Sequence, residues 1–166
     1  MKRLLIMGAL FNLFSFLVLY PVYAEEQSVN VELKQLRGEL RRAKLPVKDV
    51  NAVAGVLRSL LNENSTKEDL RSIVLAVYEK GISGSDLNTA LAYVNELVVA
   101  GVETGEAGSI VLGGIDRGLA DGFKGGDVAL MNRVRQAVRK KKAQLLEEEK
   151  KKAEKERMEQ LITDTQ

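Results

Sequence analysis

The histidine base and the cysteine nucleophile of the common catalytic triads are absent from this chain, which contains no histidine and no cysteine. Catalysis by a serine with a lysine base is formally possible, but no serine here lies in the strand-to-helix elbow that presents such a nucleophile. Zinc and haem also lack their usual ligands. We therefore expect no catalytic residue, no cofactor and no metal site. A pair of carboxylates that hydrolyses a polymer remains the enzymatic alternative, although aromatic platforms for sugars are scarce.

Two other segments have compositions that suggest ligand binding. Gly122-Phe123-Lys124-Gly125-Gly126 is rich enough in glycine for a phosphate-binding loop, but it lacks the P-loop order and would follow a helix where a P-loop follows a strand. Asp116, Asp121 and Asp127 do not have the spacing of a calcium-binding loop. The glycine-rich segment is better explained by a repeat to which it belongs.

A seven-residue pattern, consisting of glycine, an apolar residue, three small or polar residues, an acid and an apolar residue, occurs three times. The copies begin at Gly81, Gly101 and Gly122, and weaker ones begin at Lys44 and Asn64. Glycine is favoured just after a helix, where the backbone turns left-handed, and an acid is favoured in the first turn of the next helix. Each copy is therefore predicted to be a joint that ends one helix and starts another.

The acids of these joints are predicted to cap helices as the third helical residue and to do no chemistry. They are Asp49, Asp69, Asp86, Glu106 and Asp127, at successive steps of 20, 17, 20 and 21 residues. Thr66 and Ser83, three residues before the second and third acids, complete the pattern of a capping box. A regular period of this kind indicates stacked helical units.

Between the joints, apolar residues recur at helical spacing and no stretch alternates long enough for a strand. We expect helices near residues 31–43, 47–62, 67–80, 85–100, 105–120 and from about 126 onward. The predicted fold class is all-α. It has five to six short antiparallel or crossing helices in a helical-repeat bundle or a short right-handed superhelix, which forms a domain over residues 31–138.

The fifth predicted helix carries an unusual number of glycines for a helix interior. Gly114, Gly118 and Gly122 recur every four residues and so share one face. Each glycine weakens a helix by about 1 kcal/mol relative to alanine. We expect this face to pack closely against a neighbouring helix, with a hinge or ligand-approach surface as the alternative.

Residues 1–24 have the pattern of a signal peptide. Lys2 and Arg3 precede an apolar run, and small residues stand before the junction of Ala24 with Glu25. An uncleaved membrane anchor is the alternative. Removal of this segment takes two of the 25 basic residues and none of the 23 acidic ones. The mature chain is then formally neutral, which does not indicate a nucleic-acid partner. Residues 25–30 are expected to be a flexible lead.

The composition shifts at Arg139, where the apolar stripe gives way to charge. Residues 139–166 are predicted to be a charged helical tail that continues the sixth helix, either solvated or acting as a docking arm. Its apolar residues do not keep a coiled-coil register. The tail opens with a basic cluster, the candidate interaction site, which consists of Arg139, Lys140, Lys141 and Lys142.

These features favour an exported protein, periplasmic or secreted, that acts as a helical interaction or scaffolding module without catalytic activity. A protein partner in the cell envelope is expected. The alternatives are the hydrolase considered above and a peripheral binder that uses the basic cluster on anionic lipid or polymer. In that last case the attraction would be weakened strongly by salt, because acidic residues follow the cluster closely.

The signal-peptide hypothesis gives the first prediction. The protein isolated from the cell envelope or the medium should begin at Glu25, as measured by intact mass and N-terminal sequencing. Ala24→Arg should block cleavage, because the peptidase accepts only small residues there. Glu26→Gln, just beyond the cleavage site, should have no effect on the mass of the product beyond the substitution itself. An exported protein that retains Met1 would contradict the hypothesis.

Overall fold

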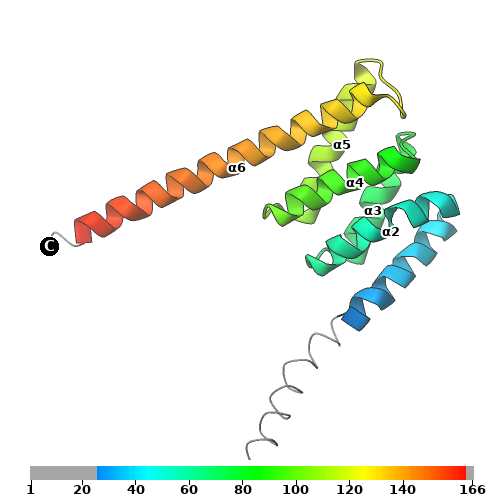
Figure 1. Ribbon diagram of the computed structural model, residues 1–166, viewed down its shortest axis with the longest axis horizontal. Helices are drawn as coiled ribbons and strands as arrows, with labels where there is room; N and C mark the ends of the chain where they lie inside the picture. The colour runs from blue at the N-terminus through cyan, green and yellow to red at the C-terminus, as the bar shows by residue number, and fades with distance from the viewer. Residues whose placement is uncertain (1–25, 164–166) are drawn as a thin grey trace, which may run out of the picture.

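Helix is the only regular secondary structure in residues 26–163, the part of the chain that the computed structural model describes (Figure 1). The all-α fold class is thereby confirmed, with six helices. An N-terminal helix covers residues 26–42. It is followed by α2 (Val47–Asn62), α3 (Lys67–Glu79), α4 (Gly84–Val99), α5 (Thr104–Ala120) and α6 (Val128–Thr163). The predicted signal peptide, residues 1–24, lies outside the described residues.

The helices stack in two layers. Each helix from α2 to α6 contacts the next helix and the next but one, so that α2, α4 and α6 form one layer and α3 and α5 form the other. Within this part of the chain, α2 does not reach α5 or α6. The N-terminal helix is tied to α3, since Lys67 Nζ lies 3.1 Å from Glu39 Oε1. Contacts restricted to near neighbours are typical of helical-repeat stacks.

The core of this stack consists of leucine, valine and isoleucine with some alanine and one methionine, and no aromatic side chain is fully buried among the described residues. Tyr78, Tyr93 and Phe123 pack only partly against it. Each helix buries one stripe at helical spacing, for example Leu87, Leu91 and Val94 in α4. This stripe is what the 3.6-residue periodicity of the sequence encodes.

Every joint between helices turns through a left-handed residue. Gly81, Gly101 and Gly122 have φ values of 79°, 87° and 90°, as their position in the repeat predicts, and Lys44 and Asn64 adopt the same conformation. In four of the five joints, all except the one at Gly81, the amide after the left-handed residue then bonds back to the last helical turn. In the α4–α5 joint, for example, Val102 N donates to Leu97 O at 3.0 Å. This backbone pattern is a Schellman turn, and it reverses the chain in few residues.

Four of the five acids are the third residues of their helices, but only one of them takes part in local capping. Thr66 Oγ1 accepts from Asp69 N at 3.1 Å and donates to Asp69 Oδ2 at 2.7 Å. Ser83, in contrast, makes no side-chain capping bond. The capping box expected at Ser83 and Asp86 is therefore not formed, because the acid has a more distant partner.

Side chains at the joints connect helices that belong to the same layer. Asp49 Oδ1 accepts from Gly84 N at 3.2 Å, and Asp86 Oδ2 accepts from Gly126 N at 2.7 Å. In the other layer the hydroxyls of Ser65 and Thr104 are 2.7 Å apart and buried. These bonds span 35, 40 and 39 residues. The repeating unit in space is therefore a pair of helices, twice the period visible in the sequence.

The last joint departs from the prediction. The sixth helix begins at Val128 and not near residue 126, and Asp127 precedes the helix instead of being its third residue. Asp127 Oδ2 accepts from Lys124 N at 2.7 Å and so closes a loop. At this joint a Cβ on Gly125 would lie 2.5 Å from Gly81 O. The two glycine joints touch one another, and this contact fixes the path of the backbone.

The beginning of the domain also differs from the prediction. Residues 26–30, expected to be part of a flexible lead, already belong to the N-terminal helix. Val29 packs partly against the core, and Asn30 Oδ1 accepts a hydrogen bond from Arg58 on α2. The residues that precede Val29 are polar, so the sequence did not indicate that the helix extends this far.

Two of the three glycines predicted to form a close-packing face, Gly114 and Gly118, do allow close helix packing. The third, Gly122, lies beyond the end of α5 and has nothing within 4 Å of its Cβ position, so the prediction is wrong for that residue. A Cβ on Gly114 would lie 2.9 Å from the Cα of Val134 in α6. One on Gly118 would overlap Leu130 Cδ1 and lie 3.6 Å from the Cβ of Arg133. Gly113, the neighbour of Gly114, faces open space apart from the Arg117 side chain at 3.8 Å. Close approach of α5 to α6 therefore depends on one face of α5.

This difference gives the second prediction. Gly114→Ala should lower the free energy of unfolding by about 1–3 kcal/mol, because the added methyl meets backbone that cannot move aside. Gly113→Ala makes the same chemical change one residue earlier and should raise stability by up to about 1 kcal/mol through helix propensity. Chemical denaturation followed by circular dichroism measures both. Equal effects of the two substitutions would exclude close packing as the role of Gly114.

Candidate interaction surface

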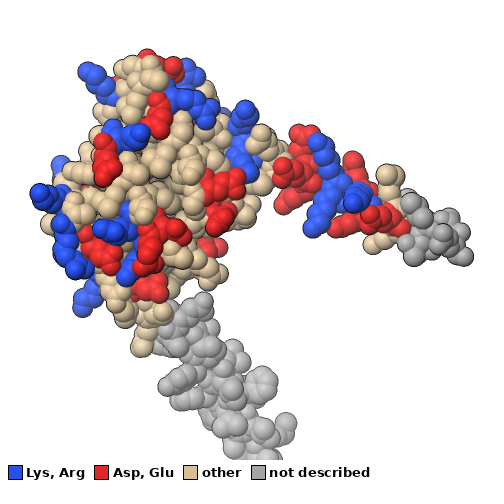
Figure 2. All heavy atoms as spheres, turned by 180° about the vertical axis from the view of Figure 1, so that it is seen from behind, with Lys and Arg blue, Asp and Glu red and all other residues tan. Residues whose placement is uncertain are grey.

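The longest helix, α6, consists of a docked half and a free half. Its first half packs against α4 and α5. Its buried side chains are Leu130, Met131, Val134 and Val138. From Leu146 to residue 160 every side chain is exposed. We call residues 146–163 the arm; it projects away from the stacked helices (Figures 1 and 2).

The arm is helical because its charges support one another along the chain. Figure 2 shows that the arm itself starts with an acidic block, which is followed by a basic block. Lys151 Nζ lies 2.8 Å from Glu147 Oε1, and Lys155 Nζ lies 3.8 Å from Glu159 Oε1. Each such pair, four residues apart, adds a few tenths of a kcal/mol to a helix. The continuous helical tail expected from the sequence is therefore present up to Thr163.

The four residues of the predicted basic cluster, at the base of the arm, do not act together. Lys141 Nζ lies 2.8 Å from Glu106 Oε1 on α5, and Lys142 Nζ lies 2.6 Å from Glu96 Oε1 on α4. Arg139 and Lys140 have no ion-pair or hydrogen-bonding partner among the described residues, and both are exposed. Two of the four cations thus fasten α6 to the domain, and two remain available to a partner.

The ion pair of Lys141 affects its protonation. The hydrogen bond to Glu106 is the main cause that raises the pKa of Lys141 above its ordinary value, against a smaller opposing effect of desolvation. A raised pKa keeps a larger fraction of the amine protonated at any pH near the pKa. The contribution of this ion pair to stability is therefore present below the unfolded pKa and is lost as the pH rises through the folded value.

A groove of about 470 Å³ lies between α5 and α6, beside the base of the arm. We call it the α5–α6 groove. Its lining residues are Arg117, Ala120, Asp121, Arg133, Gln136, Ala137 and Lys140. Three cations face one anion, Asp121, whose Oδ2 lies 2.8 Å from Arg133 Nη2. Arg117 Nε donates to Gly113 O at 3.0 Å, so its guanidinium is held without a carboxylate partner in the described residues. The groove therefore favours an acidic ligand.

In the sequence Lys140 stands out as part of a basic cluster, but nothing there groups Arg117 and Arg133 with it. The residues of α5 and α6 that line the groove are separated by a joint, and only the packing of the two helices brings them together. The available signal was Gly118, which lets α6 approach and lies beside Arg133. A glycine face on a helix indicates close packing, but it identifies the arginine that lies beside it only when the neighbouring helix is known.

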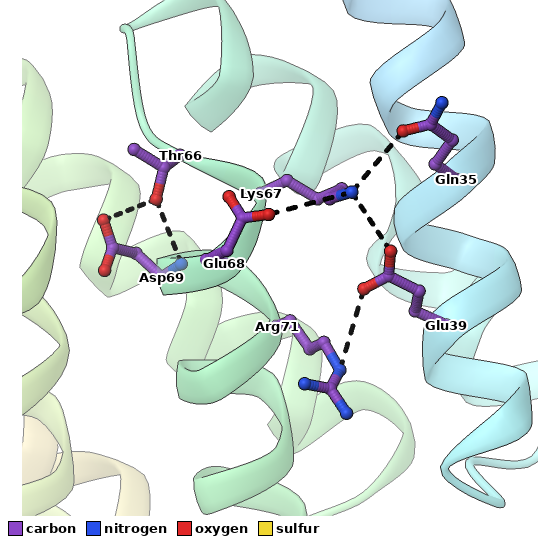
Figure 3. A network of polar contacts seen from close by, with 7 residues as sticks. All are labelled: Gln35, Glu39, Thr66, Lys67, Glu68, Asp69 and Arg71. Carbon is purple, nitrogen blue, oxygen red and sulfur yellow. Dashed lines mark hydrogen bonds and ion pairs between the residues drawn. The ribbon is translucent and has the colours of Figure 1, made fainter.

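A second groove of about 510 Å³ separates the N-terminal helix from the α2–α3 joint, and its lining includes Glu32 and Glu68. Lys67 reaches across it to Gln35 at 3.5 Å and Glu39 at 3.1 Å, beside the ion pair of Arg71 with Glu39 (Figure 3). Glu68 is 77% exposed. A carboxyl that serves as a general acid must be desolvated to stay protonated, and exposure works against this. The groove thus gives the hydrolase alternative no support.

Among the described residues, no group of three or more acids is placed to hold a metal ion. No helix of the described part is long and apolar enough to cross a bilayer. Comparison of the chain with protein-family models, curated proteins and solved structures found no significant match.

The division of the basic cluster gives the third prediction. Under limiting amine acylation, Lys140 should react faster than Lys141, because the neutral amine is the nucleophile and the pKa of Lys141 is raised. Peptide mass spectrometry measures both rates. Glu106→Gln should bring Lys141 close to the rate of Lys140, whereas Glu103→Gln, an exposed acid of the same joint, should leave it unchanged. Equal rates in the unaltered protein would show that the Glu106 contact does not persist in solution.

Proposed function

We propose that this protein is an exported, non-enzymatic scaffolding module that engages a protein partner of the cell envelope. The observation that carries the proposal is the arm. A run of 15 consecutive residues, 146–160, is helical with every side chain exposed. It extends directly from a helix that is packed into the domain.

The arm is suited to presenting a surface at a fixed distance. At about 1.5 Å per residue, its 18 residues reach roughly 27 Å beyond the domain. Lys141 and Lys142 fix its base through ion pairs with α5 and α4. A rigid element loses less conformational entropy on binding than a flexible tail does. Burial of apolar residues does not explain this helix, since few of its side chains are apolar.

The alternative of binding an anionic lipid or polymer has less support. From the basic cluster, an anionic lipid or polymer surface would meet only Arg139 and Lys140, because the other two cations of the cluster are paired within the protein. Two exposed charges provide a weak attraction at physiological salt.

The proposal of export depends on the signal-peptide pattern and is tested separately by the identity of the mature N-terminus.

The fourth prediction concerns the partner. Crosslinking in the native cell, followed by mass spectrometry, should enrich one envelope protein with the full-length chain and lose it when residues 147–166 are deleted. A second test variant exchanges Glu147-Glu148-Glu149 with Lys150-Lys151-Lys152. The exchange keeps composition and helix length but reverses the order of the charges. It should also lose the partner if the arm is recognised by its charges. Thermal melting should be unchanged in both variants. Retention of the same partner without the arm would refute the proposal.

A further inference from the structure

Four charged residues lie at intervals of seven along α6, namely Arg133, Lys140, Glu147 and Glu154. Seven residues make nearly two helical turns, so these side chains share one face of the helix within a drift of about 20° per step. The order along the stripe is two cations followed by two anions. A stripe with this order is complementary to its own reverse, since an antiparallel copy places each cation opposite an anion.

The two halves of the stripe lie in different surroundings. Arg133 and Lys140 line the α5–α6 groove together with Arg117 of α5. Glu147 and Glu154 lie on the arm, fully outside the domain. One copy therefore carries both a basic groove and an acidic helix of matching charge spacing. The docked half of α6 is straight and continuous with the arm, so the arm of one copy cannot fold back into its own groove.

We propose that the α5–α6 groove binds the arm of a second copy of this chain, antiparallel to α6, in a symmetric dimer. Lys140 faces Glu147 of the second copy and Arg133 faces Glu154 of the second copy. The two helices then cross midway between residues 143 and 144. In such an isologous interface each contact occurs twice, which doubles its effect.

The groove can accept a helix at close range. Ala120 and Ala137 contribute the small side chains of its lining, and Arg117 adds a third cation to its wall. Arg133 and Glu147 already have partners, Asp121 at 2.8 Å and Lys151 at 2.8 Å, but both ion pairs are exposed. Exposed pairs contribute little and are easily shared with a new partner. Lys140 has no partner to exchange, so it should be the most sensitive position.

The proposed interface contains few apolar side chains, so the association should be weak and dependent on salt. Ion pairs at a solvated interface mainly set register and specificity, and salt screens them. The inference does not depend on the envelope partner, because it concerns contacts between identical chains. Failure of dimerisation would leave the proposed scaffolding function untouched, and the reverse also holds.

The fifth prediction is tested by sedimentation velocity on the mature chain, which begins at Glu25. A concentration-dependent dimer is expected at low salt and should dissociate at about 0.5 M salt, where screening lengths fall to a few ångströms. Lys140→Glu and Glu147→Lys should each raise the dimer dissociation constant by roughly tenfold or more. A chain that is monomeric at every concentration and at low salt overturns the inference.

A mixing experiment separates a direct contact from a change in folding. Equal amounts of Lys140→Glu and Glu147→Lys chains should form a heterodimer as tight as the unaltered dimer, because the exchanged charges attract again at both symmetric positions. Arg139→Glu and Glu149→Lys are matched controls, since they reverse neighbouring charges on other faces of α6. They should leave the dissociation constant within about twofold. No recovery on mixing, or controls as damaging as the test variants, would also overturn the inference.

Discussion

The left-handed residue at the end of each helix is the constraint on which the rest of this structure depends. The φ values lie near 60–90° at Lys44, Asn64, Gly81, Gly101 and Gly122. After all of these except Gly81, the next amide bonds back to the last helical turn, so the chain reverses within a few residues. Because the connections are short, successive helices lie next to each other and pack together. The apolar stripe of each helix then has a neighbour on two sides, and a two-layer stack follows.

Stacking by pairs gives the polar residues of the joints a second role. Asp49 and Asp86 lie where helix caps are expected, yet each accepts a hydrogen bond from the joint two helices further along. The joints are therefore connected to one another through the thickness of the domain. At the last joint this connection and the close contact of Gly125 with Gly81 lie just before α6, which begins at Val128 and packs against α4 and α5.

The position of α6 generates all the features of functional interest. Its docked half forms the α5–α6 groove, its ion pairs at Lys141 and Lys142 fix the direction of departure, and its free half is the arm. The basic cluster, which looks uniform in the sequence, is divided by the phase of the helix. Residues 141 and 142 point to α5 and α4, and residue 140 points to the groove. The two halves of α6 thus place a charged groove and an exposed charged helix on one continuous element.

The sequence by itself determined the all-α class, the bounds of the middle helices within a residue or two, the close packing of the α5 glycine face and the continuous charged tail. All of these depend on interactions within a turn or two of the chain, namely periodicity, left-handed glycines and charges four residues apart. Only the tertiary structure decided the two-helix repeat, the later start of α6, the division of the basic cluster and the inclusion of Arg117 and Arg133 in a groove. These depend on which helix lies beside which, and contacts between residues 16 to 46 positions apart leave no periodic signal in the sequence.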